Sequence, residues 1–328
     1  MPEPKPIIYP WLRGYWAQLT RYLLQDKLPS ALMLVGDPGL GLAALAEAFS
    51  NRVVCLSPVD NLPCGSCESC LLFNAENYPD FFYVRPEDEK DSIKIEAIRE
   101  ISASLALSTH YNKPRMVILD PADGMTSPAA NSLLKTLEEP SENTCLILIT
   151  HRLVDLPATI KSRCQLIKVN DVDQVLAQAW LSDEGCHQAH QYLSMANHVP
   201  LFAYDLWQKN ALEARDSLLK DFLSLLHGRL DPILFAEKCF ILKGLPVLKW
   251  LTSWLTDAIK YAHGSQEEQL INSDLVGDLK VLIEKLHLEG MSTLVDDLSR
   301  IAALEKSQVN QQLMFEEFAI QSYSITGQ

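Results

Sequence analysis

The sequence predicts an α/β domain with a parallel sheet, followed by an all-α region. Three observations support this fold class. Short apolar runs alternate with helical stretches in the first half of the chain, which is typical of a parallel sheet covered by helices. Residues Gly36 to Ala43 read GDPGLGLA, the outline of a loop that joins a strand to a helix. From about Val172 the strand pattern disappears and helical periodicity continues to the end.

Strands of the first half are expected at short, continuous apolar runs, because a central strand of a parallel sheet is buried on both faces. Leu42–Val54, rich in Ala, Leu and Glu, is expected to form the helix after the loop, and Ala129–Glu139 a helix that Pro140 ends. The runs that predict central strands are ALMLV (Ala31–Val35), RMVILD (Arg115–Asp120) and CLILIT (Cys145–Thr150).

The second half is expected to consist of amphipathic helices. Two interpretations remain open: a small helical domain followed by a helix bundle, or one continuous helical domain over 172–328. Trp250, Trp254 and Tyr261 fall on one predicted helix and are expected to belong to its core face. The predicted helical segments are Val172–Trp207, Leu212–His227, Pro232–Lys243, Pro246–His263, Glu267–His287 and Met291–Tyr323.

Composition places the chain among globular proteins. It has 328 residues, 48% hydrophobic and 21% charged, which leaves room for two or three domains. The longest apolar runs fall far short of the roughly 20 residues that span a bilayer. Met1–Tyr9 lacks the apolar core of a signal peptide. We therefore expect a cytoplasmic protein without a membrane partner.

The net charge of −14 is unevenly distributed. Residues 1–168 carry 16 Lys and Arg against 20 Asp and Glu, whereas residues 169–328 carry 12 against 22. A surface that follows nucleic-acid phosphates needs an excess of positive charge. Strong independent binding of nucleic acid by the second half is therefore not expected.

The loop after the first strand lacks two side chains on which its chemistry depends. In a working phosphate-binding loop, backbone N–H groups surround the phosphates, a Lys meets the β- and γ-phosphates, and a Ser or Thr hydroxyl binds Mg²⁺. This chain has Leu42 and Ala43 at those two positions. The glycines Gly36, Gly39 and Gly41 are then best interpreted as a tight strand-to-helix turn.

A third loss follows a different strand. Asp120 ends the run RMVILD and is the carboxylate that would hold Mg²⁺, but the next residue is Pro121 where a hydrolysing enzyme needs Glu to polarise water. Phosphoryl transfer depends on positioned charge. Without the Lys, the hydroxyl and this carboxylate, we expect no ATP hydrolysis by the chain and no cofactor in its loop.

Four cysteines form a metal-binding pattern. They lie in CLSPVDNLPCGSCESC with the spacing C-x8-C-x2-C-x2-C, at Cys55, Cys64, Cys67 and Cys70. Two-residue spacers let thiolates converge on one ion, and four thiolates complete a tetrahedral Zn²⁺ shell, so a structural zinc is favoured. Four unligated thiols in a loop remain the alternative. Cys145, Cys164, Cys186 and Cys239 have apolar neighbours and are expected to be ordinary buried or half-buried thiols.

Five segments, in order, carry a resemblance to a known family. They read CGSCESC, NYPDFFYVRPE, IKIEAIREI, AANSLLKTLEEP and TIKSRCQ. With them the chain resembles the delta-prime subunits of the bacterial DNA polymerase III clamp loader, by specific motifs over about 1–170 and by helical pattern only beyond. The resemblance implies an AAA+ domain at 1–168 with the zinc module at 55–70, a helical lid at 169–208 and a collar at 209–328 that holds a subunit ring together.

The resemblance also assigns a role to Ser162-Arg163-Cys164. In this family such a motif resembles an arginine finger, so Arg163 is expected to reach ATP bound by a neighbouring subunit; the alternative is an ordinary exposed Arg. A lid arginine that senses ATP in active subunits would fall near Pro200 and is missing here. Thr150, at a position that senses phosphate in active relatives, is expected to cap its strand.

The leading functional hypothesis is therefore a non-hydrolysing clamp-loader subunit. It is no enzyme on its own but part of a DNA-directed DNA polymerase holoenzyme, a nucleotidyltransferase. Its expected partners are the clamp-loader ATPase subunits and the delta subunit in a hetero-oligomeric ring, and, through the complex, the sliding clamp and primed DNA. The helix Ala129–Glu139 is expected to expose Lys135, Glu138 and Glu139, with local contact to DNA as a further option.

The sequence disfavours two other functions. An autonomous ATPase with an unusual loop is disfavoured by Leu42, Ala43 and Pro121. A zinc-containing nucleic-acid-binding module is disfavoured because residues 55–70 contain Asp60 and Glu68 but no Lys or Arg.

Overall fold

The computed structural model describes residues 8–86, 92–105, 109, 111, 113–141, 143–304 and 310–326. The chain forms two compact units. The first is Met1–Asp183 with Val199–Leu201, and the second is Glu184–His198 with Phe202–Gln328. The division falls inside the segment predicted to be a lid, 169–208, and the division into three domains stays a prediction.

The first unit is built on a five-stranded sheet with the order β2-β3-β4-β1-β5, in which every pairing is parallel. The three predicted central strands are confirmed. The two outer strands were not predicted: β5 (QLIK) begins and ends with a polar residue, and β2 (FFYV) is an apolar run of only four residues that are mostly half-buried. The strands are β1 (Ala31–Val35), β2 (Phe81–Val84), β3 (Arg115–Leu119), β4 (Thr144–Thr150) and β5 (Gln165–Lys168).

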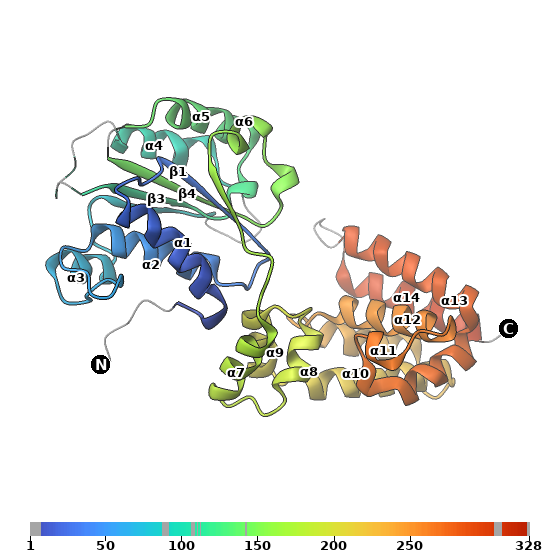
Figure 1. Ribbon diagram of the computed structural model, residues 1–328. Coiled ribbons are helices and arrows are strands. Elements are labelled where there is room, and N and C mark those ends of the chain that lie inside the picture. Colours follow the sequence, from blue (N-terminus) through green and yellow to red (C-terminus); the bar gives the residue numbers. More distant parts are fainter. Residues whose placement is uncertain are drawn as a thin grey trace. The chain divides into compact units, whose positions relative to one another are not determined.

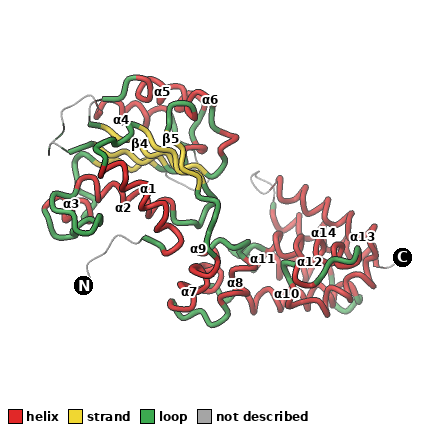
Figure 2. The backbone as a smooth tube through the Cα atoms, in the orientation of Figure 1, coloured by secondary structure: helices red, strands yellow, loops and turns green. Residues whose placement is uncertain are grey.

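Helices cover both faces of this sheet, which Figure 2 shows as one layer of yellow strands. Helices α1 and α2 lie on one face and α4, α5 and α6 on the other (Figure 1). The predicted helices after the loop and before Pro140 are confirmed. The helices of this unit are α1 (Arg13–Leu24), α2 (Leu42–Val54), α3 (Glu68–Asn74), α4 (Ile95–Leu105), α5 (Ser127–Glu138), α6 (Ala158–Lys161) and α7 (Gln174–Asp183).

A buried ion pair connects the outer strand β2 to its neighbour β3. Arg115 begins β3 and Asp80 precedes β2; Nη2 of the arginine lies 3.2 Å from Oδ1 of the aspartate, and the side chains are 4% and 1% exposed. Nε of Arg115 donates to the same oxygen over 3.3 Å. Because neither side chain reaches water, each charge needs a partner of opposite sign, and the pair supplies one.

The second unit is entirely helical among its described residues, as predicted. Helix α9 crosses the division between the units, since Val199–Leu201 belongs to the first. Helix α12 packs against α13, and α11 against α14. The helices are α8 (Ala189–Met195), α9 (Pro200–Gln208), α10 (Ala211–Leu226), α11 (Pro232–Ile241), α12 (Val247–Ala262), α13 (Val276–Leu304) and α14 (Gln311–Thr326).

Two predicted helices of this unit have other bounds. The helix predicted over Glu267–His287 begins only at Val276, because Glu267–Gln269 and Ser273–Leu275 form separate 3-10 turns. His287 interrupts α13 with φ 51° and ψ 170°. The helix predicted over Met291–Tyr323 is wrong as a single element: α13 ends at Leu304 and α14 begins at Gln311. Residues 305–309 of that prediction lie outside the described residues.

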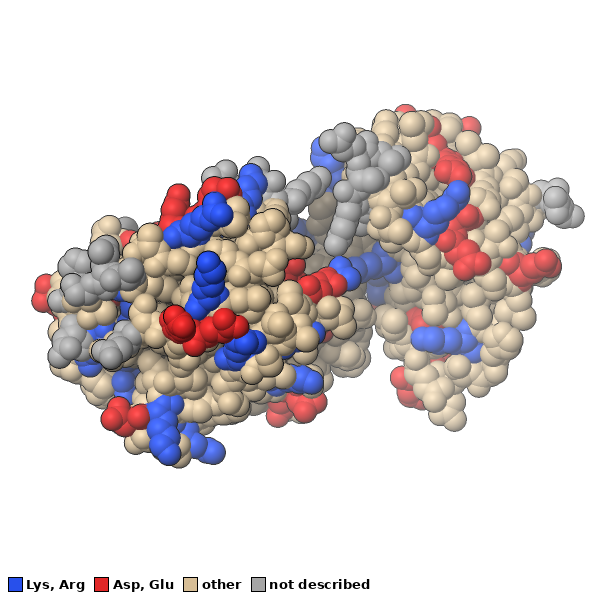
Figure 3. All heavy atoms as spheres, turned by 90° about the horizontal axis from the view of Figure 1, so that it is seen from above, with Lys and Arg blue, Asp and Glu red and all other residues tan. Residues whose placement is uncertain are grey.

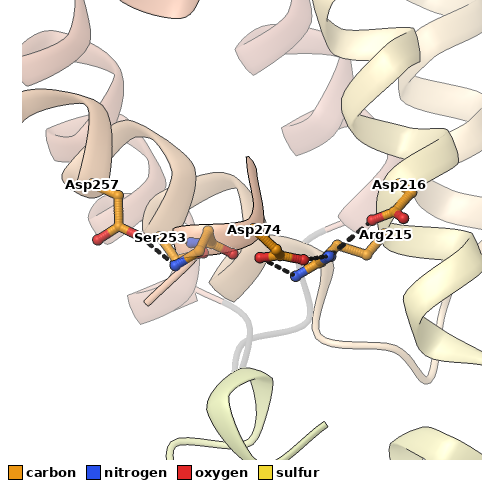
Figure 4. Close-up of polar contacts among 6 residues, drawn as sticks. Arg215, Asp216, Ser253, Asp257 and Asp274 are labelled. Carbon is orange, nitrogen blue, oxygen red and sulfur yellow. Dashed lines mark hydrogen bonds and ion pairs between the residues drawn. The ribbon is translucent and has the colours of Figure 1, made fainter. Parts of the chain in front are cut away.

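Polar contacts fix the irregular segment before α13 (Figure 4). Arg215 of α10, with a side chain 4% exposed, pairs with Asp274 and, over 2.9 Å, with its neighbour Asp216. Asp257 of α12 accepts hydrogen bonds from the backbone and side-chain nitrogens of Asn272, each 2.8 Å long. These contacts hold both sides of the segment, which explains why it does not continue as a helix.

The predicted aromatic stripe is largely confirmed as core. Trp250 is 3% exposed, Trp254 is fully buried and Tyr261 is half-buried. The four cysteines outside the motif are also buried, except Cys164, which is half-buried.

No helix in the described ranges is both long enough and apolar enough to cross a membrane. On the face shown in Figure 3, Lys and Arg side chains are interspersed with Asp and Glu. Over the part of that face that the structure describes, no extended area of one sign is visible.

The buried pair gives a stability prediction. Substituting Asp80→Ala removes a buried carboxylate partner of the Arg115 guanidinium, so we expect unfolding to become easier by about 3–5 kcal/mol. The control Asp155→Ala breaks the exposed pair with Arg152, whose side chains are 60% and 39% exposed, and is expected to cost about 1 kcal/mol or less. Calorimetric unfolding of both variants measures the difference, and equal effects would contradict it.

Candidate functional site

The turn after β1 depends on its glycines. Gly41 precedes α2 with φ +87°, and a Cβ there would lie 2.6 Å from the ring of Tyr9. A Cβ on Gly36 would lie 2.8 Å from the backbone oxygen of Val169. Both positions therefore exclude a side chain by close approach, and Gly41 also by its left-handed backbone.

Backbone carbonyl oxygens of this turn form hydrogen bonds with other parts of the chain. The indole Nε1 of Trp11 donates to the carbonyl of Leu40 over 2.9 Å, and the backbone N–H of Leu201 donates to the carbonyl of Gly39 over 3.1 Å. Nδ1 of His151 lies 2.8 Å from the carbonyl of Gly36. The turn is thus tied to three distant segments of the sequence.

Aromatic rings cover the same turn. Tyr9 stacks on Trp11 with ring centroids 4.9 Å apart, and both meet Trp180 of α7 edge to face. Offset stacks and edge-to-face pairs are favourable arrangements of aromatic rings. This cluster was not predicted, because its members are far apart in the sequence.

The two positions that carry Lys and Ser or Thr in a working loop contribute only apolar groups here. Leu42 is 3% exposed and belongs to the core, and Ala43 is half-buried on α2. They supply neither a positive charge nor an oxygen ligand for Mg²⁺.

The carboxylate of Asp120, directly after β3, is engaged by another residue. The hydroxyl of Tyr83 on β2 donates to Oδ2 of Asp120 over 2.7 Å. Burial, and then the hydrogen bond to Asp120, raise the pKa of Tyr83, so the phenol stays protonated and acts as the donor. Pro121 follows and offers no carboxylate.

The expectation that the hydroxyl of Thr150 caps its strand is wrong. Thr150 ends β4 and is fully buried, and its Oγ1 has no hydrogen-bond partner among the residues that the structure describes. Its backbone oxygen instead accepts from the N–H of Gly36 over 3.2 Å. The strand end is held through the main chain.

Arg163 lies between α6 and β5. Its backbone N–H donates to the carbonyl of Ile160, a fully buried residue, over 3.1 Å. Its side chain is 35% exposed and forms an ion pair of 2.7 Å with Glu138, the last residue of α5. The sequence did not indicate this pair, because an acidic residue at a helix end is usually solvated.

The sheet separates Arg163 from the loop of its own chain. Strands β1 and β5 are parallel, with Leu32 paired to Gln165 and Val35 to Lys168. Arg163 precedes the first pair, whereas Gly36 follows the last. Four residues of strand rise about 13 Å, so the backbone of Arg163 and the loop lie at opposite ends of the strands.

The four cysteines of the motif come together where α2 ends and α3 begins, with Cys70 inside α3. Their Sγ atoms all lie within 4.8 Å of one another. The distances from Sγ of Cys55 are 3.6 Å to Cys64 and 3.9 Å to Cys67, and Cys64 lies 4.0 Å from Cys70. Tetrahedral zinc with Zn–S bonds of about 2.3 Å places its sulfurs about 3.8 Å apart. The cluster therefore has the dimensions to hold a metal ion such as zinc.

The pKa is lowered for two thiols of this cluster, Cys64 and Cys67, whereas burial raises the pKa of Cys55 and Cys70. The N–H of Cys64 donates to Sγ of Cys55, and the N–H of Cys67 to Sγ of Cys64, each over 3.3 Å. The backbone N–H groups of Ser66 and Cys67 lower the pKa of Cys64 to about 6. A thiolate is the form that binds a metal.

Comparisons with known proteins agree with these features. Residues 12–173 match the family model described as "DNA polymerase III, delta subunit", and residues 209–322 match "DNA polymerase III, delta subunit, C terminal". The chain is 30% identical to the DNA polymerase III subunit delta' of Pseudomonas aeruginosa over 327 residues, which covers 98% of each chain.

The chain belongs to the family of DNA polymerase III delta-prime subunits. The Escherichia coli delta-prime subunit is likewise 30% identical, over 89% of this chain and 88% of its own. A solved gamma subunit-related protein of Thermotoga maritima has a TM-score of 0.50 at 21% identity over 96% of this chain and 99% of its own, which supports the fold. For this delta-prime family member, the predicted fold class is confirmed: a parallel α/β domain is followed by a helical region.

The cysteine cluster gives a prediction of its own. A chelator that removes a metal ion held by the cluster is expected to loosen residues 55–80 and leave the sheet folded, because the four cysteines lie outside the five strands. Hydrogen exchange measured by mass spectrometry is expected to rise in 55–80 and stay unchanged in β1, β3 and β4. Unfolding of the sheet would contradict this.

The matched variants separate ligands from other cysteines. Cys67→Ser is expected to lose the bound metal, and Cys164→Ser, outside the cluster, is expected to keep it, as measured by elemental analysis of the purified proteins. Equal metal content in both would contradict the assignment of ligands.

Proposed function

We propose that this chain is a non-hydrolysing subunit of the DNA polymerase III clamp loader that provides Arg163 to ATP bound by a neighbouring subunit. The observation that carries the proposal is the position of Arg163. Its side chain is 35% exposed, and its backbone lies at the sheet edge opposite the loop of its own chain. A guanidinium placed there can serve a nucleotide of another chain but not one in its own loop.

The absence of hydrolysis by the chain itself is supported by the atoms around its loop. Leu42 and Ala43 provide no charge and no oxygen, Asp120 accepts a hydrogen bond from Tyr83, and Pro121 cannot orient water. Near Pro200, where the resemblance implies that a lid arginine is missing, the N–H of Leu201 binds the loop carbonyl of Gly39. The groups that catalyse phosphoryl transfer, a positive charge, a Mg²⁺ ligand and a carboxylate that orients water, are therefore lacking at this loop.

The contribution of an arginine in trans is electrostatic. Charge on the transferred phosphoryl group increases at the transition state, and a guanidinium that meets it lowers the barrier. Arginine suits this role because it stays protonated and presents five N–H donors in a planar group.

We further propose that the four cysteines hold a structural zinc, with Cys55, Cys64, Cys67 and Cys70 as ligands. Four thiolates leave no open position for a substrate or water, so the ion stabilises the local fold and does no chemistry. The segment connects α2 to β2, and Phe73 of α3 packs on Phe81 with centroids 4.4 Å apart. Zinc would thereby fix this connection.

The proposed partners follow from the family. The chain would take its place in a ring with the clamp-loader ATPase subunits and the delta subunit, and through the ring would act on the sliding clamp and primed DNA in the cytoplasm. Residues 169–208 would serve as the lid and 209–328 as the collar. The mixed charge of the surface does not favour independent binding of DNA, so we propose that contacts with DNA are made through the complex.

The first test compares assemblies that contain this chain or its Arg163→Ala variant. ATP hydrolysis stimulated by clamp and primed DNA is expected to lose the contribution of the site that Arg163 completes, because removing such a finger slows its site by about 10³-fold or more. Arg152→Ala, which removes an exposed arginine of the same unit, is the matched control and should leave the rate unchanged.

Gel filtration establishes that each variant assembles equally. An unchanged rate with Arg163→Ala in a complete assembly would contradict the proposal and leave the subunit a purely architectural role.

Restoring the loop alone is not expected to create an ATPase. The double variant Leu42→Lys, Ala43→Thr still lacks the carboxylate at Pro121, and Tyr83 still engages Asp120. Phosphate release by the isolated chain in the presence of Mg²⁺ is therefore expected to stay at background. Rapid hydrolysis would show that the loss at Pro121 does not matter.

A further inference from the structure

The side chain of Arg163 is held by two elements. Glu138 ends α5 and its Oε1 lies 2.7 Å from Nη2 of the guanidinium. On the other side, Nη1 donates to the carbonyl of Thr159 in α6 over 2.9 Å and approaches Oγ of Ser162 at 3.4 Å. Helices α5 and α6 lie on the same face of the sheet (Figure 1). The guanidinium is thus fixed relative to two helices at once.

The ion pair is too exposed to be important for folding. The side chain of Glu138 is 50% exposed and that of Arg163 is 35% exposed. Pairs with such exposure change an equilibrium by about fivefold at most, because water and salt screen the charges. The adjacent Glu139 is exposed as well. The consequence of the pair is instead the position in which it holds this arginine.

The pair acts on the conformational freedom of the arginine side chain. A free arginine on the surface has many rotamers, and only some of them place the guanidinium where a neighbour's phosphate could meet it. A partner on each side reduces these rotamers before the subunits meet. Reaction rates are sensitive to such placement, because a group that is already oriented loses little entropy at the transition state.

We propose that Glu138 is a positioning residue for Arg163. The proposal rests on the proposed function of Arg163 as a finger in trans. Glu138 touches no nucleotide in this scheme and acts only through the arginine, by holding Nη2 while Thr159 holds Nη1.

The donors of the guanidinium allow contact with phosphate while the pair persists. Arginine has five N–H groups. The hydrogen bonds to Thr159 and Ser162 use Nη1, and the ion pair with Glu138 faces Nη2, which leaves Nε–H for an incoming oxygen. Glu138 therefore need not release the arginine for the reaction.

A positioning role has a kinetic signature. The neighbour's own loop binds ATP, so loss of Glu138 should leave KM for ATP unchanged. The part of kcat that depends on Arg163 should fall, because fewer assemblies have the guanidinium in place. A merely structural role would change assembly or stability and leave the Arg163-dependent kcat of the complete assembly unchanged.

The test measures ATP hydrolysis in the complete assembly with the chain as Glu138→Gln, Glu139→Gln or Glu138→Asp. The rate with Arg163→Ala defines the background from other sites. We expect Glu138→Gln to lower the Arg163-dependent kcat about two- to fivefold, in line with the strength of an exposed pair, with KM within about twofold. Glu139→Gln should match the unchanged chain, and Glu138→Asp, which retains the charge, should restore at least half of the loss.

A double variant shows whether Glu138 acts through the arginine. In the Arg163→Ala background, Glu138→Gln should cause no additional decrease, since the group that it positions is gone. An additional decrease would overturn the proposal, because Glu138 would then act by another route.

The remaining outcomes distinguish the two proposals. If Arg163→Ala lowers the rate but Glu138→Gln equals Glu139→Gln, the positioning role is overturned and the function of Arg163 stands. A rise in rate with Glu138→Gln would mean that the glutamate restrains the finger, which also overturns positioning. If Arg163→Ala has no effect, the proposed function fails and this inference fails with it.

Discussion

The parallel direction of the five strands is the constraint on which the rest of the structure depends. It brings the turns after β1, β3 and β4 to one edge of the sheet, so that Gly36, Asp120 and Thr150 share that edge. The same rule places the connections that precede the strands at the other edge, where α5 ends at Glu138 and α6 leads to Arg163. One sheet thus presents two chemically different ends.

The first of these ends has the turn of a phosphate-binding loop but neither its Lys nor its hydroxyl residue. Gly41 remains because the ring of Tyr9 lies against it, and the carbonyls of the turn bind Trp11 and Leu201. Apolar packing at Leu42 and the hydrogen bond from Tyr83 to Asp120 take the place of charge and metal ligands. In the proposed function, this end links parts of one subunit while the opposite end serves a neighbour.

Sequence reasoning succeeded where the signal is local. The buried strands Ala31–Val35 and Cys145–Thr150 are continuous apolar runs, and the cysteine spacing predicted the cluster whose four sulfurs lie together. It failed where the cause is tertiary. The edge strands β2 and β5 are defined by pairing with neighbours, and the segment before α13 is held by Asp257 and Arg215 from other helices.

Residues around the proposed site show the same limit. The Ser-Arg-Cys motif drew attention to Arg163, but nothing in a single sequence distinguishes Glu138, which contacts it, from the adjacent Glu139, which serves as its control. Tyr9, Trp11 and Trp180 meet over a separation of more than half the chain. Only the fold brings such groups together.

The central claim is that one subunit has an inactive loop and completes the active site of another. Its most direct test is an electron cryomicroscopy structure of the assembly with ADP and beryllium fluoride, which mimics the γ-phosphate. The account predicts that the guanidinium of Arg163 lies within hydrogen-bond distance of the fluoride on the neighbouring subunit, about 3 Å, and that the loop at Gly36–Gly41 holds no nucleotide. A nucleotide in that loop, or Arg163 turned to solvent away from the neighbour's site, would contradict it.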